Sequence, residues 1–185
     1  MEEQRRPILQ LDSGQSLLEV ALLTPILLAL LLGVIELGRY AYFAILVGNA
    51  ARAGAAYGSQ SRGQSTDGTG ICQAASNDFF QSGGYTCSGA YPNYTSAGSA
   101  AGAATLTLNM QTSCGCESAG DMPPAPPNTP GDCSDAAATA CGNQWVITMS
   151  VTASSQITPL INYPGLPGSL TVQRTATMPV AVPTP

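Results

Sequence analysis

Residues 17–37 read LLEVALLTPILLALLLGVIEL, an apolar run whose only charged residues are Glu19 and Glu36. At a rise of about 1.5 Å per residue, a helix of this length extends about 31 Å, the hydrocarbon thickness of a bilayer. A helix that packs on a domain surface has a polar face, and this run has none. The run therefore predicts a single membrane-spanning helix.

A cleaved secretory signal is the main alternative for this segment. Its apolar region would be shorter, about 7–15 residues, with a small-x-small cleavage site just beyond it. Here Arg39 and Tyr40 follow the run, and Ala51-Arg52-Ala53 lies well past it. We therefore expect an anchor that remains in the membrane. Residues 40–57 lack proline and are rich in alanine, so we expect the helix to continue beyond the bilayer.

The composition argues against nucleic-acid binding and against catalysis. Charged residues make up 9% of the chain, its formal net charge is -5, and it contains no histidine. The six basic residues are scattered arginines, whereas phosphate neutralisation needs a basic patch. Histidine is the commonest general base and metal ligand. We expect no enzymatic activity, no cofactor, no bound metal and no nucleic-acid partner.

All six cysteines follow the apolar run. They are Cys72, Cys87, Cys114, Cys116, Cys133 and Cys141. Disulfides persist mainly in oxidising compartments, and no histidine is present to complete a zinc site, so we favour disulfides over zinc. This places the N-terminus in the cytoplasm and the C-terminal part outside the inner membrane. The flanking arginines are too evenly divided to decide the orientation.

The pairing of the cysteines is open, because six cysteines allow many connectivities. Closeness in sequence suggests Cys72 with Cys87, and the pair Cys114 and Cys116 with Cys133 and Cys141.

The C-terminal part predicts a small α+β domain. Alternating apolar residues predict strands at 104–112, 144–153 and 169–178. Residues 71–81 predict a helix with Phe79 and Phe80 in the core, whereas 58–70 predict a linker and 83–102 a turn-rich segment. The expected architecture is an antiparallel sheet backed by one or two helices and stapled by disulfides. The expected divisions are a cytoplasmic leader (1–14), the transmembrane and extended helix (15–57) and the extracytoplasmic domain (58–185).

Two features of the segment after the membrane bear on partners. Ala50, Gly54 and Gly58 recur every fourth residue, and small residues at this spacing let another backbone approach closely. The approaching backbone could belong to another subunit or to this chain's own domain, and the sequence leaves both open. Tyr40, Tyr42 and Phe43 are expected to form an aromatic belt at the outer membrane interface.

Glu19 is costly inside a membrane, about 2.5–3.5 kcal/mol at the centre of a span. One explanation is that it lies near the cytoplasmic face, where it reaches water or is protonated. Another is that it has an ionic partner. A cut after Gly14 would create an α-amino group at Gln15, and this amine could pair with the carboxylate of an adjacent subunit. Such a pair would offset the cost and would fix the axial register between helices.

The segment from Gly14 and Gln15 through Glu19, with Pro25, GVIELGR at 33–39 and NAARAGA at 49–55, resembles the TadE-like family. Members are pseudopilins or minor components of tight-adherence (Tad/Flp) pilus machinery. The resemblance covers about the first 57 residues. It implies that a prepilin peptidase cuts after Gly14 and that Glu19 serves recognition or assembly. The expected partners are the membrane, other pilin-like or Tad subunits and the peptidase, in a bacterial inner membrane.

The alternative function is a single-pass anchored binding module that is unrelated to pilus assembly. In that case the apolar helix is only a tether.

Overall fold

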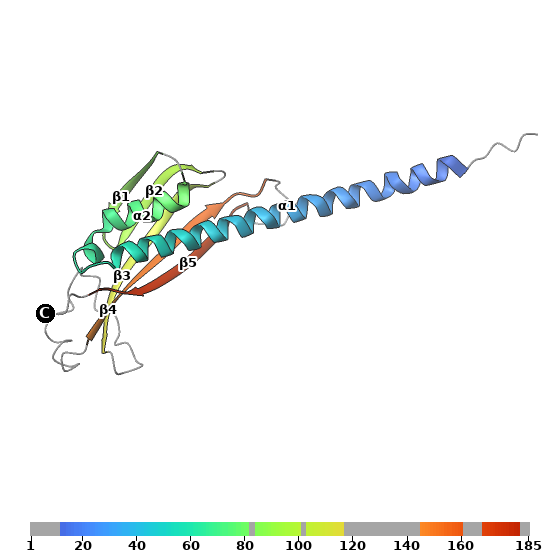
Figure 1. Cartoon of the computed structure of the whole chain (residues 1–185). Coiled ribbons are helices and arrows are strands. Elements are labelled where there is room, and N and C mark those ends of the chain that lie inside the picture. The colour runs from blue at the N-terminus through green and yellow to red at the C-terminus, as the bar shows by residue number, and fades with distance from the viewer. Residues whose placement is uncertain (1–11, 82–83, 101–102, 117–144, 161–167, 182–185) are drawn as a thin grey trace, which may run out of the picture. The chain divides into compact units, whose positions relative to one another are not determined.

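The computed structural model describes residues 12–81, 84–100, 103–116, 145–160 and 168–181 (Figure 1). The chain divides into two units, Met1–Arg39 and Tyr40–Pro185. The helix α1 runs through both of them. In chain order the elements are α1 (Asp12–Gly58), the 3-10 turn η1 (Gln64–Thr66), α2 (Gly68–Phe80), β1 (Tyr85–Ala90), β2 (Asn93–Ala100), β3 (Ala103–Cys116), β4 (Trp145–Ile157) and β5 (Leu170–Pro179).

In the first unit, α1 carries the apolar run. It is long and apolar enough to cross a membrane, and its large apolar side chains are exposed along the whole run. The helix continues past Pro25, although proline removes one backbone donor. The Thr24 hydroxyl donates to the Val20 carbonyl oxygen at 2.6 Å, so its polar group is satisfied within the helix. Glu36 and Arg39, three residues apart on the helix, form an ion pair with 2.9 Å between Oε2 and Nη1.

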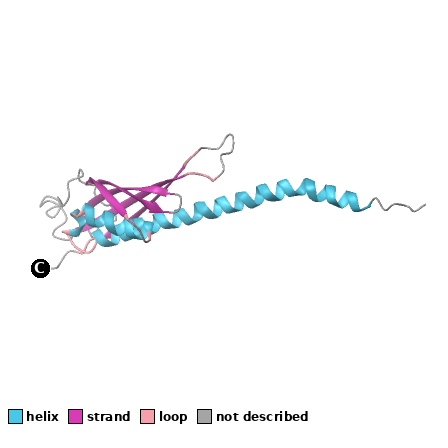
Figure 2. Ribbon diagram, turned by 90° about the horizontal axis from the view of Figure 1, so that it is seen from above, coloured by secondary structure: helices cyan, strands magenta, loops and turns pink. Residues whose placement is uncertain are grey.

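The second unit contains a five-stranded antiparallel sheet in the order β1-β2-β3-β4-β5 (Figures 1 and 2). Each strand pairs with the next along the chain, which is the arrangement of a meander. The later part of α1 and the whole of α2 pack on one face of this sheet. The predicted class, a long N-terminal helix followed by an antiparallel α+β domain, is confirmed.

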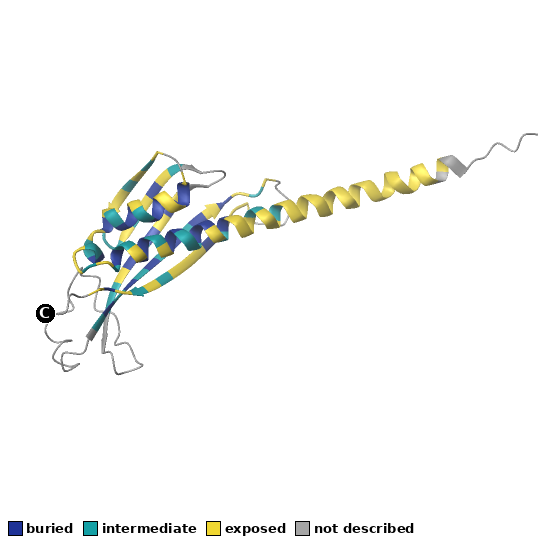
Figure 3. Ribbon diagram, in the orientation of Figure 1, coloured by how far each residue is buried: buried dark blue, intermediate teal, exposed yellow. Residues whose placement is uncertain are grey.

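The core lies between the two helices and the inner face of the sheet (Figure 3). The helix α1 contributes Phe43, Val47 and Ala50 among others, and α2 contributes Ile71 and Phe79. The sheet contributes alternate residues of its central strands, because successive side chains point to opposite faces. They are Leu106, Leu108, Met110, Ile147, Met149, Val151 and Ala153.

The small residues of α1 pack against this chain's own domain. A Cβ placed on Gly54 would lie 3.3 Å from both Ile71 and Val151, and one on Gly58 would lie 3.0 Å from Met149. The glycines therefore let α1 approach the sheet and α2 closely. The aromatic-belt prediction was wrong for Phe43, because its side chain is 2% exposed and belongs to the core.

All three predicted strands are confirmed as β3, β4 and β5, and β3 continues to Cys116. The prediction of a turn-rich segment at 83–102 was wrong, because β1 and β2 occupy most of it. The predicted linker at 58–70 is also partly wrong, since it contains η1 and the first turn of α2. These elements have polar, glycine-rich sequences, and pairing and packing with the rest of the domain stabilise them.

Candidate functional site

The peptide bond between Gly14 and Gln15 lies in the first turn of α1, which begins at Asp12. The first four N–H groups of an α-helix have no carbonyl partner within the helix. Unwinding this turn therefore breaks few hydrogen bonds, and helix ends fray readily. Gly14 is exposed, and a Cβ placed on it would meet no other atom within 4 Å. The described residues therefore do not pack against Gly14, the residue before the predicted cleavage position.

Glu19 lies one turn after Gln15, on an exposed stretch of α1. Residues four apart on a helix are neighbours on one face, so Glu19 and the backbone nitrogen of Gln15 lie on the same side. Among the residues that the structure describes, Glu19 makes no ion pair or hydrogen bond. It differs in this respect from Glu36, which pairs with Arg39.

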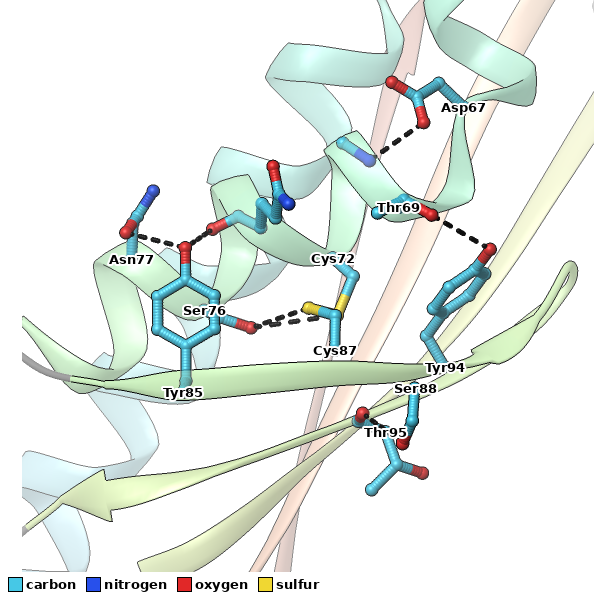
Figure 4. Close-up of a disulfide and its surroundings, with 12 residues drawn as sticks. Asp67, Thr69, Cys72, Ser76, Asn77, Tyr85, Cys87, Ser88, Tyr94 and Thr95 are labelled. Carbon is cyan, nitrogen blue, oxygen red and sulfur yellow. Dashed lines mark hydrogen bonds between the residues drawn. A yellow bond between two sulfur atoms is a disulfide. The ribbon is translucent and has the colours of Figure 1, made fainter.

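The predicted pairing of Cys72 with Cys87 is confirmed by a disulfide that joins α2 to the edge strand β1 (Figure 4). Cys72 is fully buried and Cys87 is partly buried. The Ser76 hydroxyl lies 3.8 Å from the Cys72 sulfur and 3.7 Å from the Cys87 sulfur. Zinc binding by these two cysteines is thereby excluded. The disulfide also agrees with the predicted oxidising compartment.

The second predicted cysteine group, Cys114 and Cys116 with Cys133 and Cys141, lies only partly within the described residues. Cys114 and Cys116 lie in the last residues of β3, opposite Ile147 and Trp145 of β4. Cys133 and Cys141 fall outside the described residues, so their predicted pairing with Cys114 and Cys116 stays a prediction. In the parts of the chain that the structure describes, no group of three metal-ligating side chains is present.

A cap at the start of α2 was missed by the sequence reasoning. The Asp67 carboxylate accepts the Gly70 N–H through Oδ1 and the Tyr57 hydroxyl through Oδ2, both at 2.9 Å. These bonds lower the pKa of Asp67, with the Gly70 N–H as the largest cause. Asp67 thus links α2 to the end of α1. The signal in the sequence is an aspartate three residues before a glycine at a helix start, which is typical of an N-cap.

The outer face of the sheet is polar, which the sequence analysis also did not anticipate. It carries hydroxyl and amide side chains in rows across the strands, with Asn93 beside Asn109 and Thr152 beside Thr175. The strand register places these four residues in one row across β2 to β5. A neighbouring row crosses all five strands and consists of Ser88, Thr95, Thr107, Ser154 and Gln173. The described part of this face has no charged side chain, so it lacks the groups needed for general acid–base chemistry.

The TadE-like protein family matches residues 14–56 of this chain. The match begins at Gly14 and covers Glu19, the whole apolar run and most of the helical segment that packs on the sheet. This family consists generally of non-enzymatic structural proteins. No curated protein and no solved structure matches the chain.

Proposed function

We propose that this chain is a TadE-like pseudopilin, or a minor structural component, of a Tad-type pilus or secretion apparatus. The match of residues 14–56 to the family carries the proposal. The geometry of the first turns of α1 supports it, because an exposed Gly14 precedes Glu19, which has no ion pair among the described residues of this apolar helix. In this role the chain is structural and catalyses no reaction.

The proposed mechanism has two steps. A prepilin peptidase hydrolyses the bond between Gly14 and Gln15, which leaves a cationic α-amino group at the membrane face. The Glu19 carboxylate of one subunit then pairs with the amine of its neighbour. The pair compensates the cost of placing the carboxylate among apolar side chains, and it fixes how far one helix is shifted along the other.

The proposed location is the inner membrane of a bacterium, with the N-terminus in the cytoplasm and the sheet domain outside. The length and apolar surface of α1 support a single span. The disulfide between Cys72 and Cys87 supports the orientation, because thiols remain reduced in the cytosol.

The first experiment is N-terminal sequencing of the membrane-extracted protein, which we expect to begin at Gln15. The second compares Glu19→Gln with the control Glu36→Gln, which removes a carboxylate from the same helix. We expect both variants to insert in the membrane, and only Glu19→Gln to lose co-purification with the other pilus subunits. Normal co-assembly of Glu19→Gln would show that the carboxylate has no assembly role.

An anchored binding module is the second candidate, and one observation favours it. The small residues of α1 after the membrane are used inside this chain's own core, so they are not free to pack against other subunits. If the protein retains residues 1–14 and does not co-purify with pilus components, the tether function is supported instead.

A further inference from the structure

The exposed large apolar side chains of the second unit gather at one end of the domain. In the described residues of this unit there are five of them, which we call the apolar rim: Tyr40, Tyr42, Ile45, Leu160 and Leu170. Three belong to the part of α1 that enters the domain. Leu160 lies three residues after β4, and Leu170 is the first residue of β5. Ile45 is 61% exposed and Leu160 is 68% exposed, so these side chains lie on the surface of the domain.

The direction of α1 along the sheet brings these residues to the same end. Gly58 lies against Met149, and Gly54 lies against Val151. Gly48 lies beside Arg174, which pairs with Ala153 of β4. Moving toward the start of α1 therefore means moving toward the end of β4.

The next residues in that direction complete the rim. Ile157 ends β4 and pairs with Leu170 at the start of β5. Tyr40, Tyr42 and Ile45 precede Gly48 on α1, so they lie toward this same end of the sheet as Leu170 and Leu160.

The rest of the described surface of the domain has a different chemistry. The outer face of the sheet exposes serine, threonine, asparagine and glutamine side chains, such as Thr107, Thr175 and Gln173. Single exposed apolar residues are ordinary, but a group confined to one end marks a surface that is covered in the working protein.

We propose that the apolar rim lies in the interfacial layer of the lipid bilayer, in the leaflet from which the domain emerges. The occupant is lipid because the α1 part of the rim continues the apolar run along the chain. Tyr40 follows the last residue of that run, Leu37, by three positions. Tyrosine is enriched at membrane–water interfaces, where its ring is apolar and its hydroxyl reaches water. Leu160 and Leu170 then add a second contact, from the β4–β5 end of the sheet.

This contact would give the domain two attachments to the membrane, the helix and the rim. A contact at the rim adds a second restraint on the orientation of the domain at the membrane surface. The apolar rim thus fixes which faces of the sheet domain are presented to neighbouring subunits. The inference rests on the proposed membrane anchoring of α1, so its test must distinguish the two.

The test uses the full-length protein in vesicles of phosphatidylcholine and phosphatidylglycerol. The photoreactive residue benzoylphenylalanine is placed singly at Leu160, Leu170, Leu27, Thr107 or Thr175. All five positions are exposed, so the fold is expected to tolerate each replacement. Leu27 reports on the span, and the two threonines on the outer face of the sheet are the controls. After irradiation, lipid adducts are measured by intact-protein mass spectrometry.

We expect lipid adducts at positions 27, 160 and 170, at least five-fold above those at 107 and 175. Adducts at 27 with none above the controls at 160 and 170 would overturn the rim contact and leave the anchor intact. An absence of adducts at 27 would overturn both. Cross-links between copies of the chain at 160 and 170, in place of lipid adducts, would assign the apolar rim to a protein interface and reject the proposal.

Discussion

Gly54 of α1 lies so close to Val151 of β4 that a Cβ at position 54 would be 3.3 Å from Val151 Cγ1. The Cβ of Ala75 would be nearly as close, at 3.4 Å. The backbone of α1 therefore packs directly against both the sheet and α2.

We predict that Gly54→Leu destabilises the domain by about 1–3 kcal/mol, because the added carbons have no space. The control is Ala56→Leu, two residues further along the same helix, where the side chain is exposed and the effect should lie within about 0.5 kcal/mol. Denaturant unfolding in detergent measures both. Equal stability of the two variants would contradict the close packing of α1 on the sheet.

The Asp67 cap gives a second prediction. Asp67→Ala leaves the Gly70 N–H without its acceptor, and we expect a loss of about 1 kcal/mol in the free energy of unfolding. The control is Asp78→Ala in the last turn of α2. Negative charge is unfavourable near a helix C-terminus, so this variant should leave the free energy of unfolding unchanged or raise it slightly. Thermal unfolding followed by circular dichroism compares the variants. Similar losses for both would contradict a specific capping role for Asp67.

The same carboxylate makes stability depend on pH. Its folded-state pKa is lowered, chiefly by the Gly70 N–H and then by the Tyr57 hydroxyl, below the unfolded value of about 3.9. The unfolded state therefore binds the proton more tightly. The stabilisation is fully present above that value and is lost as the pH falls through the lowered folded-state pKa.

This effect is measured by unfolding the wild type and Asp67→Asn at a series of acidic pH values. The wild type should lose more stability than the variant below about pH 4. The difference should be small, because the carboxylate is exposed. If the stability of the two proteins falls in parallel with pH, the ionised carboxylate of Asp67 does not contribute to stability.

The Cys72–Cys87 disulfide gives a fourth prediction. It closes a loop with a sequence separation of 15, for which the chain-entropy relation gives about 3 kcal/mol. The double variant Cys72→Ala/Cys87→Ala should lose stability of this order, and the loss should free the edge strand β1 first, since β1 pairs only with β2 in the sheet. Amide hydrogen exchange of β1 and denaturant unfolding measure the two effects. Unchanged protection of β1 would show that packing alone holds it.

Much of the fold could be predicted, because its signals are local. The alternation of Leu106, Leu108 and Met110 correctly predicted β3, and Phe79 and Phe80 were correctly expected in the core. The strands β1 and β2 were not found, because their sequences contain Ser, Gly and Ala rather than large apolar residues. Gly98 allows close packing there, since a Cβ would lie 3.0 Å from the Phe80 ring. Gly89 has φ of +136°, which residues with side chains rarely adopt.

The sequence by itself determined the apolar run, the position of Glu19 within it, the helix that continues to Gly58 and the three longest strands. These follow from composition and periodicity over neighbouring residues, which act before any distant contact forms. Only the tertiary structure decided that Phe43, Gly54 and Gly58 face this chain's own sheet. It also selected, from the pairings that the sequence left open, the suggested disulfide between Cys72 and Cys87. These outcomes depend on contacts between residues far apart in the chain, and the free energy of those contacts is not encoded in any one segment.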